Sequence, residues 1–215
     1  MKVLMDTGGL AGTNCYVVAD EAAGECVLFD APDHTVGPLL DQIKQNGWKL
    51  KGLWLTHGHF DHLADHKVVT DAFPGTPILI HKLDEPKLLD PRSRVFPLPF
   101  TIPPGRASGF VEDGQALAIG GLSCRVMHTP GHAPGHVCYH FEADELLIGG
   151  DLIIGGSIGR YDLPDSDATA LAESVRKVMV LPDDTRLLGG HGGPTTIGEE
   201  RRSNEAVRMI LGLRT

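Results

Sequence analysis

Four apolar runs of this sequence each end in a glycine-flanked histidine or aspartate, and this recurrence constrains the fold more than any other feature. The runs 52–55, 122–127, 146–148 and 187–188 are followed by THGHFDH (56–62), TPGHAPGH (129–136), GGD (149–151) and GGHGG (189–193). Short apolar runs bounded by turn residues predict buried strands. Because active sites collect at the strand ends of layered α/β folds, we expect the four motifs to meet in space.

Amphipathic helices are predicted between the strands. Apolar residues spaced i, i+3, i+4, i+7 predict a helix at Val36–Ile43, and Gly47 provides its stop. Further helices are expected at 171–179 and from the capping box Thr196–Glu199 through Leu211. Additional strands are predicted at Tyr16–Val18, Val27–Phe29, Ile78–Ile80 and Val137–Phe141. Strands mixed with such helices imply sheets covered by helices.

Composition and charge narrow the class of protein. The chain has 215 residues, 41% of them hydrophobic, and no linker or repeat, so we expect a single domain spanning residues 1–215. The net charge of -9 argues against nucleic acid as a partner and leaves a small-molecule substrate. No apolar run approaches the roughly 20 residues that span a bilayer, and no signal-like stretch follows Met1. Cysteines without a C-x-x-C pair are expected as reduced core thiols of a cytoplasmic protein. The oligomeric state stays open.

The THGHFDH motif carries the strongest chemical signal. In an extended segment His57 and His59 lie on the same side, so both imidazoles can reach one metal ion. Asp61 and His62 follow where the chain turns into a helix, and they are expected to project towards a neighbouring point. Such a density of histidine and aspartate is rarely a packing solution, because each buried imidazole or carboxylate needs a partner.

The ordered set THGHFDH, TPGHAPGH, GGD and GGHGG resembles the metallo-β-lactamase superfamily. The segment GSIGRYDLP (156–164) is similar to its small glyoxalase II-like (hydroxyacylglutathione hydrolase-like) branch. The resemblance runs from about Thr13 to Glu200. It implies an α/β fold, a four-layer αβ/βα sandwich in which two mixed β-sheets are flanked by helices, with metals at one edge of the sheets.

The resemblance also implies ligands for two divalent metal ions. The first ion would be held by His57, His59 and His132, the second by Asp61, His62 and His191, and Asp151 would bridge both. Asp61 would also orient the attacking hydroxide or accept its proton. Imidazoles and carboxylates without thiolates suit zinc first, with iron and manganese also compatible.

Other residues are expected around these ligands. Arg160 and Asp162 should pair with each other or brace the Asp151 loop, and His136 is a candidate for a hydrogen bond near the site. The remaining histidines match no motif and are expected in ordinary surface or core positions: His34, His66, His81, His128 and His140.

The sequence departs from the family pattern at several points. Ala64 and Asp65 stand where the family commonly has two small residues, and we expect Asp65 to be a solvated helix residue. Tyr161 occupies a place usually held by a smaller residue. No counterpart is expected of the C-terminal helical domain through which fuller glyoxalase II enzymes bind glutathione. The prolines between Pro91 and Gly105 predict a long irregular loop, either a surface excursion or a wall of the substrate pocket.

The resulting hypothesis is a glyoxalase II-like hydrolase of a small acyl thioester, S-lactoylglutathione or a related compound, that acts through metal-activated hydroxide. Two alternatives share the fold: a mononuclear-iron persulfide dioxygenase, and a lactonase or other esterase. β-Lactam hydrolysis is disfavoured because no secretory segment is visible. A metal-stabilised scaffold is disfavoured because a structural zinc site closes with four ligands.

Overall fold

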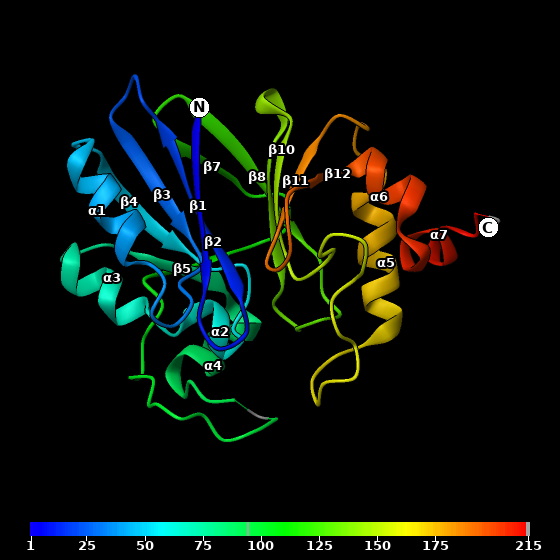
Figure 1. The fold of residues 1–215 in the computed structure, drawn as a ribbon, viewed down its shortest axis with the longest axis horizontal. Helices are drawn as coiled ribbons and strands as arrows, with labels where there is room; N and C mark the ends of the chain where they lie inside the picture. Colours follow the sequence, from blue (N-terminus) through cyan, green and yellow to red (C-terminus); the bar gives the residue numbers. More distant parts are fainter. Residues whose placement is uncertain (94, 214–215) are drawn as a thin grey trace.

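The computed structural model describes residues 1–93 and 95–213 and arranges them in four layers (Figure 1). Two six-stranded sheets lie face to face in the middle, and helices cover the outer face of each. The first sheet has the order β1 (Lys2–Gly8), β2 (Thr13–Asp20), β3 (Glu25–Phe29), β4 (Lys49–Trp54), β5 (Ile78–His81), β6 (Gly109–Val111). The second has the order β12 (Thr195–Thr196), β11 (Arg186–Gly189), β10 (Leu146–Gly150), β9 (Val137–Phe141), β8 (Leu122–His128), β7 (Ala116–Ile119).

Helices follow the same division between the two halves of the chain. Those of the first half are α1 (Gly37–Gln45), α2 (Phe60–Leu63), α3 (His66–Ala72) and α4 (Glu85–Leu89), with the short 3-10 helix η1 (Lys82–Asp84). Those of the second half are α5 (Ala168–Val178), α6 (Ile197–Ser203) and α7 (Glu205–Leu211), with η2 (Glu142–Asp144). Both sheets are mixed: β3, β4, β5 and β6 run parallel, as do β10 and β11, and the other pairs are antiparallel. The predicted sandwich is confirmed.

Three apolar clusters fill the spaces between the layers. One lies under α1 and α3, a second lies between the sheets, and a third lies under α5 and α7. The middle cluster is aromatic, with Phe29 packed edge-on against Trp54 and Tyr139 at ring-centroid distances of 5.6 and 5.0 Å. The Tyr139 hydroxyl donates to the carbonyl of Leu55 over 2.9 Å. This contact joins the second sheet to the end of β4, immediately before the THGHFDH motif.

The C-terminal segment forms two helices, and the prediction of a single third helix was wrong. The capping interaction at its start is present, since Thr196 Oγ1 accepts from the amide of Glu199. At Asn204, however, the backbone is extended (φ -77°, ψ 109°) and its side chain caps α7 by accepting from the amides of Ala206 and Val207. An asparagine that caps the following turn favours a new helix over continuation.

The strands β1, β6, β7 and β12 were not predicted; all are short or lie at sheet edges, where burial leaves a weak apolar pattern.

Asp65 is buried, and the expectation that it is solvated was wrong. It lies between α2 and α3 with 9% of its surface exposed, and its Oδ2 accepts from the amide of Thr35 over 3.2 Å. The chain bends between the two short helices, so this side chain meets the loop after β3 instead of solvent.

The four cysteines are free and buried, as expected, and burial raises the pKa of Cys26 to about 12, which keeps this thiol protonated.

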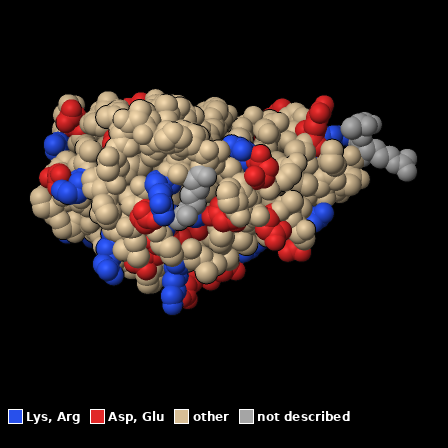
Figure 2. All heavy atoms as spheres, turned by 90° about the horizontal axis from the view of Figure 1, so that it is seen from below, with Lys and Arg blue, Asp and Glu red and all other residues tan. Residues whose placement is uncertain are grey.

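The proline-rich segment forms neither helix nor strand in its described part, as predicted; residue 94 lies outside the described residues. In the part of the chain that the structure describes, no helix is long and apolar enough to cross a membrane. On the face drawn in Figure 2, basic and acidic side chains are interspersed rather than gathered into one basic patch.

We expect Gly131→Ala to destabilise the fold, because the backbone at Gly131 has φ +133° and an added Cβ would lie 2.2 Å from the amide nitrogen of Leu171 in α5. Strain of this kind costs about 1–3 kcal/mol before any repacking. Urea unfolding of the chelator-treated protein measures the free energy of unfolding. Gly37→Ala, with nothing within 4 Å, is the control and should change stability by less than about 0.5 kcal/mol. Equal stability of the two variants would contradict the role of this turn.

Candidate metal centre

The four motifs converge at one edge of the sandwich. His57 and His59 follow β4, His132 lies between β8 and β9, Asp151 follows β10 and His191 follows β11. Asp61 and His62 lie in α2, which begins directly after the first histidines. Their donor atoms form three overlapping groups, each with all its atoms within 4.8 Å of one another: His57, His59, His132; His57, His62, Asp151; and Asp61, His62, His191.

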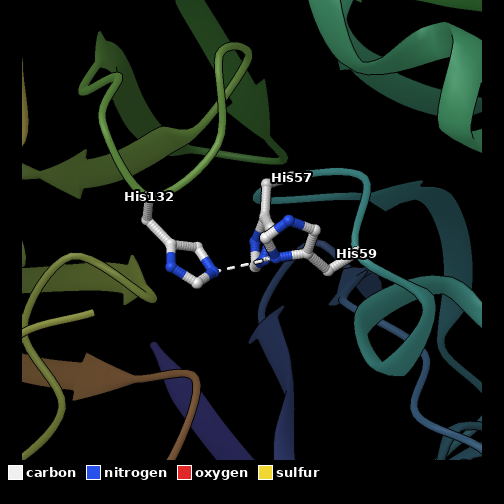
Figure 3. A group of neighbouring side chains, drawn as sticks. All are labelled: His57, His59 and His132. Carbon is white, nitrogen blue, oxygen red and sulfur yellow. Dashed lines mark hydrogen bonds between the residues drawn. The ribbon is translucent and has the colours of Figure 1, made fainter. Parts of the chain in front are cut away.

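The first group consists of three imidazoles that point towards one another (Figure 3). His59 Nδ1 lies 3.0 Å from His57 Nε2 and 2.9 Å from His132 Nε2. Three ligand nitrogens at the Zn–N distance of ≈ 2.0–2.1 Å in a tetrahedral site lie about 3.3 Å apart. The spacing of these nitrogens is therefore close to that of three ligands of one small cation.

The group of Asp61, His62 and His191 adjoins the group of three imidazoles, and Asp151 lies between them. Its Oδ2 is 3.3 Å from the Nε2 atoms of both His132 and His191, and its Oδ1 is 3.3 Å from His62 Nε2. Asp61 Oδ2 lies 3.5 Å from the Nε2 atoms of His62 and His191. One carboxylate that reaches members of both groups has the placement needed to bridge two ions.

Hydrogen bonds on the outer side of the rings fix which nitrogen points inward. Asp30 Oδ2 accepts from His62 Nδ1 over 2.9 Å, so in the neutral ring the Nε2 lone pair of His62 is directed at the carboxylates. Thr56 Oγ1 donates to the same oxygen over 2.8 Å and accepts from His57 Nδ1 over 3.0 Å. Asp30 therefore sets the tautomer of two imidazoles, one directly and one through Thr56, as carboxylates behind metal-ligating histidines do.

Backbone carbonyls fix the orientation of two further rings, those of His132 and His191. His132 Nδ1 donates to the carbonyl of Arg160 over 2.8 Å, and His191 Nδ1 donates to that of Gly12 over 3.3 Å. A carbonyl only accepts, so Nδ1 carries a proton in both rings, and the inward Nε2 carries a lone pair whenever the ring is neutral. His59 is reversed, with Nδ1 inward and Nε2 3.9 Å from Asp165.

The arrangement fits a divalent cation. Within the described part of the chain, His62 Nε2 and Asp151 Oδ1 are buried and have no hydrogen-bond partner. Buried polar atoms without partners are costly, and converging lone pairs repel one another unless a positive charge lies among them. Nitrogen and oxygen donors without thiolates suit zinc, iron or manganese.

The histidines on the two sides of Asp151 differ in their pKa values. Burial, reinforced by the neighbouring imidazoles, lowers the pKa of His57, and burial lowers the pKa of His132 to about 4, so both rings are neutral at pH 7. For His62, burial opposes the charge, but Asp151, Asp61 and Asp30 raise its pKa well above the usual value. For His191, burial is likewise outweighed by hydrogen bonds to Asp151 and Asp61, which raise its pKa to about 10.

The two carboxylates stay ionised at neutral pH. Burial alone would raise the pKa of Asp61, but His62, His191 and Thr13 lower it to about 2. The pKa of Asp151 is lowered in the same way, because burial is outweighed by His62, His191 and His132. Positive charge on His62 and His191 thus balances the carboxylates where no metal ion does so.

Several residues that shape the site were missed by the sequence analysis. Asp30 directly follows β3, so it repeats the pattern of an aspartate at a strand end, a signal that could have identified it. Its φ of 58° is left-handed, which aspartate tolerates better than most residues. Asp84 is fully buried and accepts from the amide of Gly58 over 2.7 Å and from that of Gly135 over 2.9 Å. It thereby joins the THGHFDH and TPGHAPGH loops, and no sequence signal marks it.

Asn14 positions the loop of His191. Its side-chain amide donates to the carbonyls of Gly189 and Gly192 over 3.0 and 2.8 Å. Gly190 has to be a glycine, since an added Cβ would lie 2.1 Å from Asp151 Oδ1. The abundance of glycine around the motifs therefore allows backbone to approach the donor atoms closely, at this position at least.

The three residues expected around the ligands lie in different environments. His136 is buried; its Nε2 accepts from the amide of Asp151 over 2.9 Å, and its Nδ1 pairs with Thr129 Oγ1. Arg160 pairs with Asp162 through two hydrogen bonds of 2.9 and 3.0 Å, as predicted, and both side chains are exposed.

The other five histidines lie outside the donor groups. His66 is buried and its Nδ1 donates to the carbonyl of Leu63, whereas His81 and His128 stack at a ring distance of 4.2 Å. The ring of His34 lies edge-on to that of Phe100, and His140 lies on β9.

Metal binding by the group Asp61, His62 and His191 is expected to release protons and to strengthen as the pH rises. The raised pKa values of His62 and His191 mean that a cation must displace their protons, and this competition continues up to a pH of about 10. His57 and His132 are already neutral at pH 7, so they should add little pH dependence to metal binding near that pH. Calorimetric titration of chelator-treated protein with zinc, in buffers of different ionisation enthalpy, measures the protons released. An equal pH dependence of both binding steps would contradict this assignment.

We expect Asp30→Asn to weaken metal binding by about 10–100-fold, the usual effect of removing a carboxylate behind a ligating histidine. The amide can present its NH₂ to His62 and so disturb the tautomer that Asp30 fixes. Competition with a chromogenic chelator measures the affinity. Asp71→Asn is the control, because Asp71 is exposed and pairs with Lys67 on the same helix. Unchanged affinity in a folded Asp30→Asn protein would refute the role.

Comparison with known proteins gives the family. Residues 8–191 match the sequence model of the Metallo-beta-lactamase superfamily. A Haemophilus influenzae protein named Hydroxyacylglutathione hydrolase GloC is 32% identical over 197 residues, which cover 89% of this chain and 91% of that protein.

Two solved structures resemble the whole chain. The crystal structure of BLEG-1 B3 metallo-beta-lactamase has a TM-score of 0.88 and 33% identity, with 96% of this chain and 99% of that chain covered. That of TTHA1623 in a di-iron-bound form has a TM-score of 0.82 and 35% identity, with 93% and 98% covered. Sequence, fold and donor geometry agree. The chain belongs to the metallo-β-lactamase superfamily, and its donor groups are compatible with the divalent metals that this superfamily binds.

Proposed function

We propose that this protein hydrolyses a small acyl thioester at a pair of divalent metal ions. The observation that carries the proposal is the convergence of seven donor side chains on two adjoining points beside an open cavity. A structural zinc site needs only four ligands and keeps no open position. The similarity to a hydroxyacylglutathione hydrolase and the GSIGRYDLP segment favour a thioester among the possible substrates.

In this proposal the residues divide into two ligand sets that share Asp151. His57, His59 and His132 hold one ion, and Asp61, His62 and His191 hold the other. When bound, divalent ions lower the pKa of a coordinated water from 15.7 towards ≈ 7 and polarise a carbonyl oxygen. His136 supports Asp151, because its ring accepts the backbone amide of that residue.

In this proposal Asp61 orients the attacking water or accepts its proton. Its Oδ2 accepts from Thr13 Oγ1 over 2.7 Å, which fixes the carboxylate, and it lines the cavity. The reaction joins a water oxygen to the carbonyl carbon and breaks the C–S bond. The products are a carboxylate, a thiol and one proton, and the thiolate needs little help to leave.

The identity of the ions follows from the donors only in part. Zinc fits the nitrogen and oxygen ligands, and we assign it first; the relative solved in a di-iron-bound form keeps iron in consideration. A second candidate reaction is β-lactam hydrolysis, which the BLEG-1 likeness favours. A mononuclear-iron dioxygenase is the weaker candidate, because a single ion would leave the donor group of Asp61, His62 and His191 without a cation.

The test combines metal analysis with turnover. We expect about two metal ions per chain, and hydrolysis of thioesters but not of nitrocefin. His132→Ala should lower kcat/KM more than roughly 100-fold, since substitutions behind ligands alone cost 10–100-fold. His140→Gln, on β9 outside the donor groups, is the matched control. The proposal would be refuted by one iron per chain together with oxygen consumption when a persulfide is the substrate. It would also be refuted if the protein hydrolysed lactones or nitrocefin but no thioester.

A further inference from the structure

The cavity beside the donor groups is small and its walls are mainly apolar. Its volume is about 260 Å³. Sites that enclose a drug-sized ligand hold roughly 300–1,000 Å³, so this cavity encloses only part of such a molecule. The apolar side chains that line it are Ala11, Phe60, Val95, Phe96, Leu163 and Pro164.

One wall comes from the proline-rich loop and the start of α2. Phe96 packs edge-on against Phe60 at a ring distance of 5.7 Å, yet 45% of Phe96 and 55% of Val95 stay exposed. Leu163 and Pro164, in the segment that follows Arg160, also line the cavity. Exposed apolar side chains beside a reaction centre form a surface that an apolar group can cover.

The basic residues of the cavity are already engaged. Among the described residues that line it, Lys87 lies 2.6 Å from Asp165, Arg92 lies 2.6 Å from Asp90, and Arg160 pairs with Asp162. Lys87 is in addition 3.3 Å from the buried Asp84. The two carboxylates of glutathione would have to compete with the acidic partners that these cations already have. Asp165, itself part of the lining, would repel such carboxylates.

From these walls and pairs we infer the substrate class: the protein selects thioesters by an apolar acyl group, seated between Phe60, Phe96 and Leu163, and does not require glutathione as the thiol. The inference rests on the proposed thioester hydrolysis. Burial of one methylene contributes about fourfold, the equivalent of ≈ 0.8 kcal/mol. Between an acetyl and a hexanoyl group, partial burial of the four added methylenes gives an increase of at least roughly 10-fold in kcat/KM.

The experiment separates the acyl group from the thiol on the metal-loaded protein. Acetyl, butanoyl and hexanoyl thioesters of N-acetylcysteamine vary the acyl group, and the hexanoyl thioester of glutathione varies the thiol. We expect kcat/KM to rise at least about 10-fold along the acyl series and to change less than about threefold between the two thiols. S-Lactoylglutathione should be a poorer substrate than either hexanoyl thioester.

Phe96→Ala tests the wall itself. It should reduce kcat/KM for the hexanoyl thioester at least fivefold more than for the acetyl thioester. The control is Phe110→Ala, which removes an exposed phenylalanine of β6 that does not line the cavity. A loss that is equal for all acyl groups would overturn the assignment of this wall.

The outcomes distinguish this inference from the proposal beneath it. If lactoylglutathione is hydrolysed more than 10-fold faster than every neutral thioester, or if kcat/KM falls along the acyl series, the inference is wrong and thioester hydrolysis stands. If no thioester is hydrolysed by protein with its full metal content, the proposed function is wrong and the inference falls with it.

Discussion

Charge neutralisation at one buried edge is the constraint on which this structure depends. Four Nε2 atoms, one Nδ1 atom and two carboxylates point inward there. Lone pairs held so closely repel one another, and burial removes the water that would otherwise solvate them. Protons on His62 and His191 can offset the two carboxylates, but the imidazoles of His57 and His132 stay neutral and have no such compensation. A pair of cations meets both requirements, which is why the proposed metals suit the donor set.

The rest of the fold holds these donors against their mutual repulsion. Three of the rings are fixed from behind by groups from different parts of the chain: Asp30 after β3, the carbonyl of Arg160, and that of Gly12. Asp84 joins two of the ligand loops, and Tyr139 joins the sheets just before the first motif. Removing one of the hydrogen bonds to a ring nitrogen frees that ring to turn. The rigid strand ends and the hydrogen bonds behind the rings therefore hold the donors in the positions that the proposed metals require.

Reactivity and selectivity lie in different structural elements. The donors sit at strand ends, where both sheets and their aromatic core limit movement. The apolar wall comes from irregular segments, the loop around Phe96 and the segment around Leu163, in which residues can change without disturbing the donors. This separation gives a physical reason why members of one superfamily can share a metal centre and act on different small molecules. In this chain the wall composition, rather than the metal centre, is the basis for the inferred preference.

By itself the sequence determined the local patterns and the residue types. Alternating and short apolar runs located β9, β10 and β11, and the density of His, Asp and Gly after them indicated metal chemistry. The family resemblance supplied the sandwich. Contacts between distant segments were decided only by the tertiary structure, because their partners are far apart in sequence: Asp30 behind His62, Asp84 between two loops, Asp65 against Thr35. The break at Asn204 also escaped prediction, since a capping asparagine and a helix interior look alike without their surroundings. Local periodicity reports which face is buried; it carries no information on which residue lies opposite.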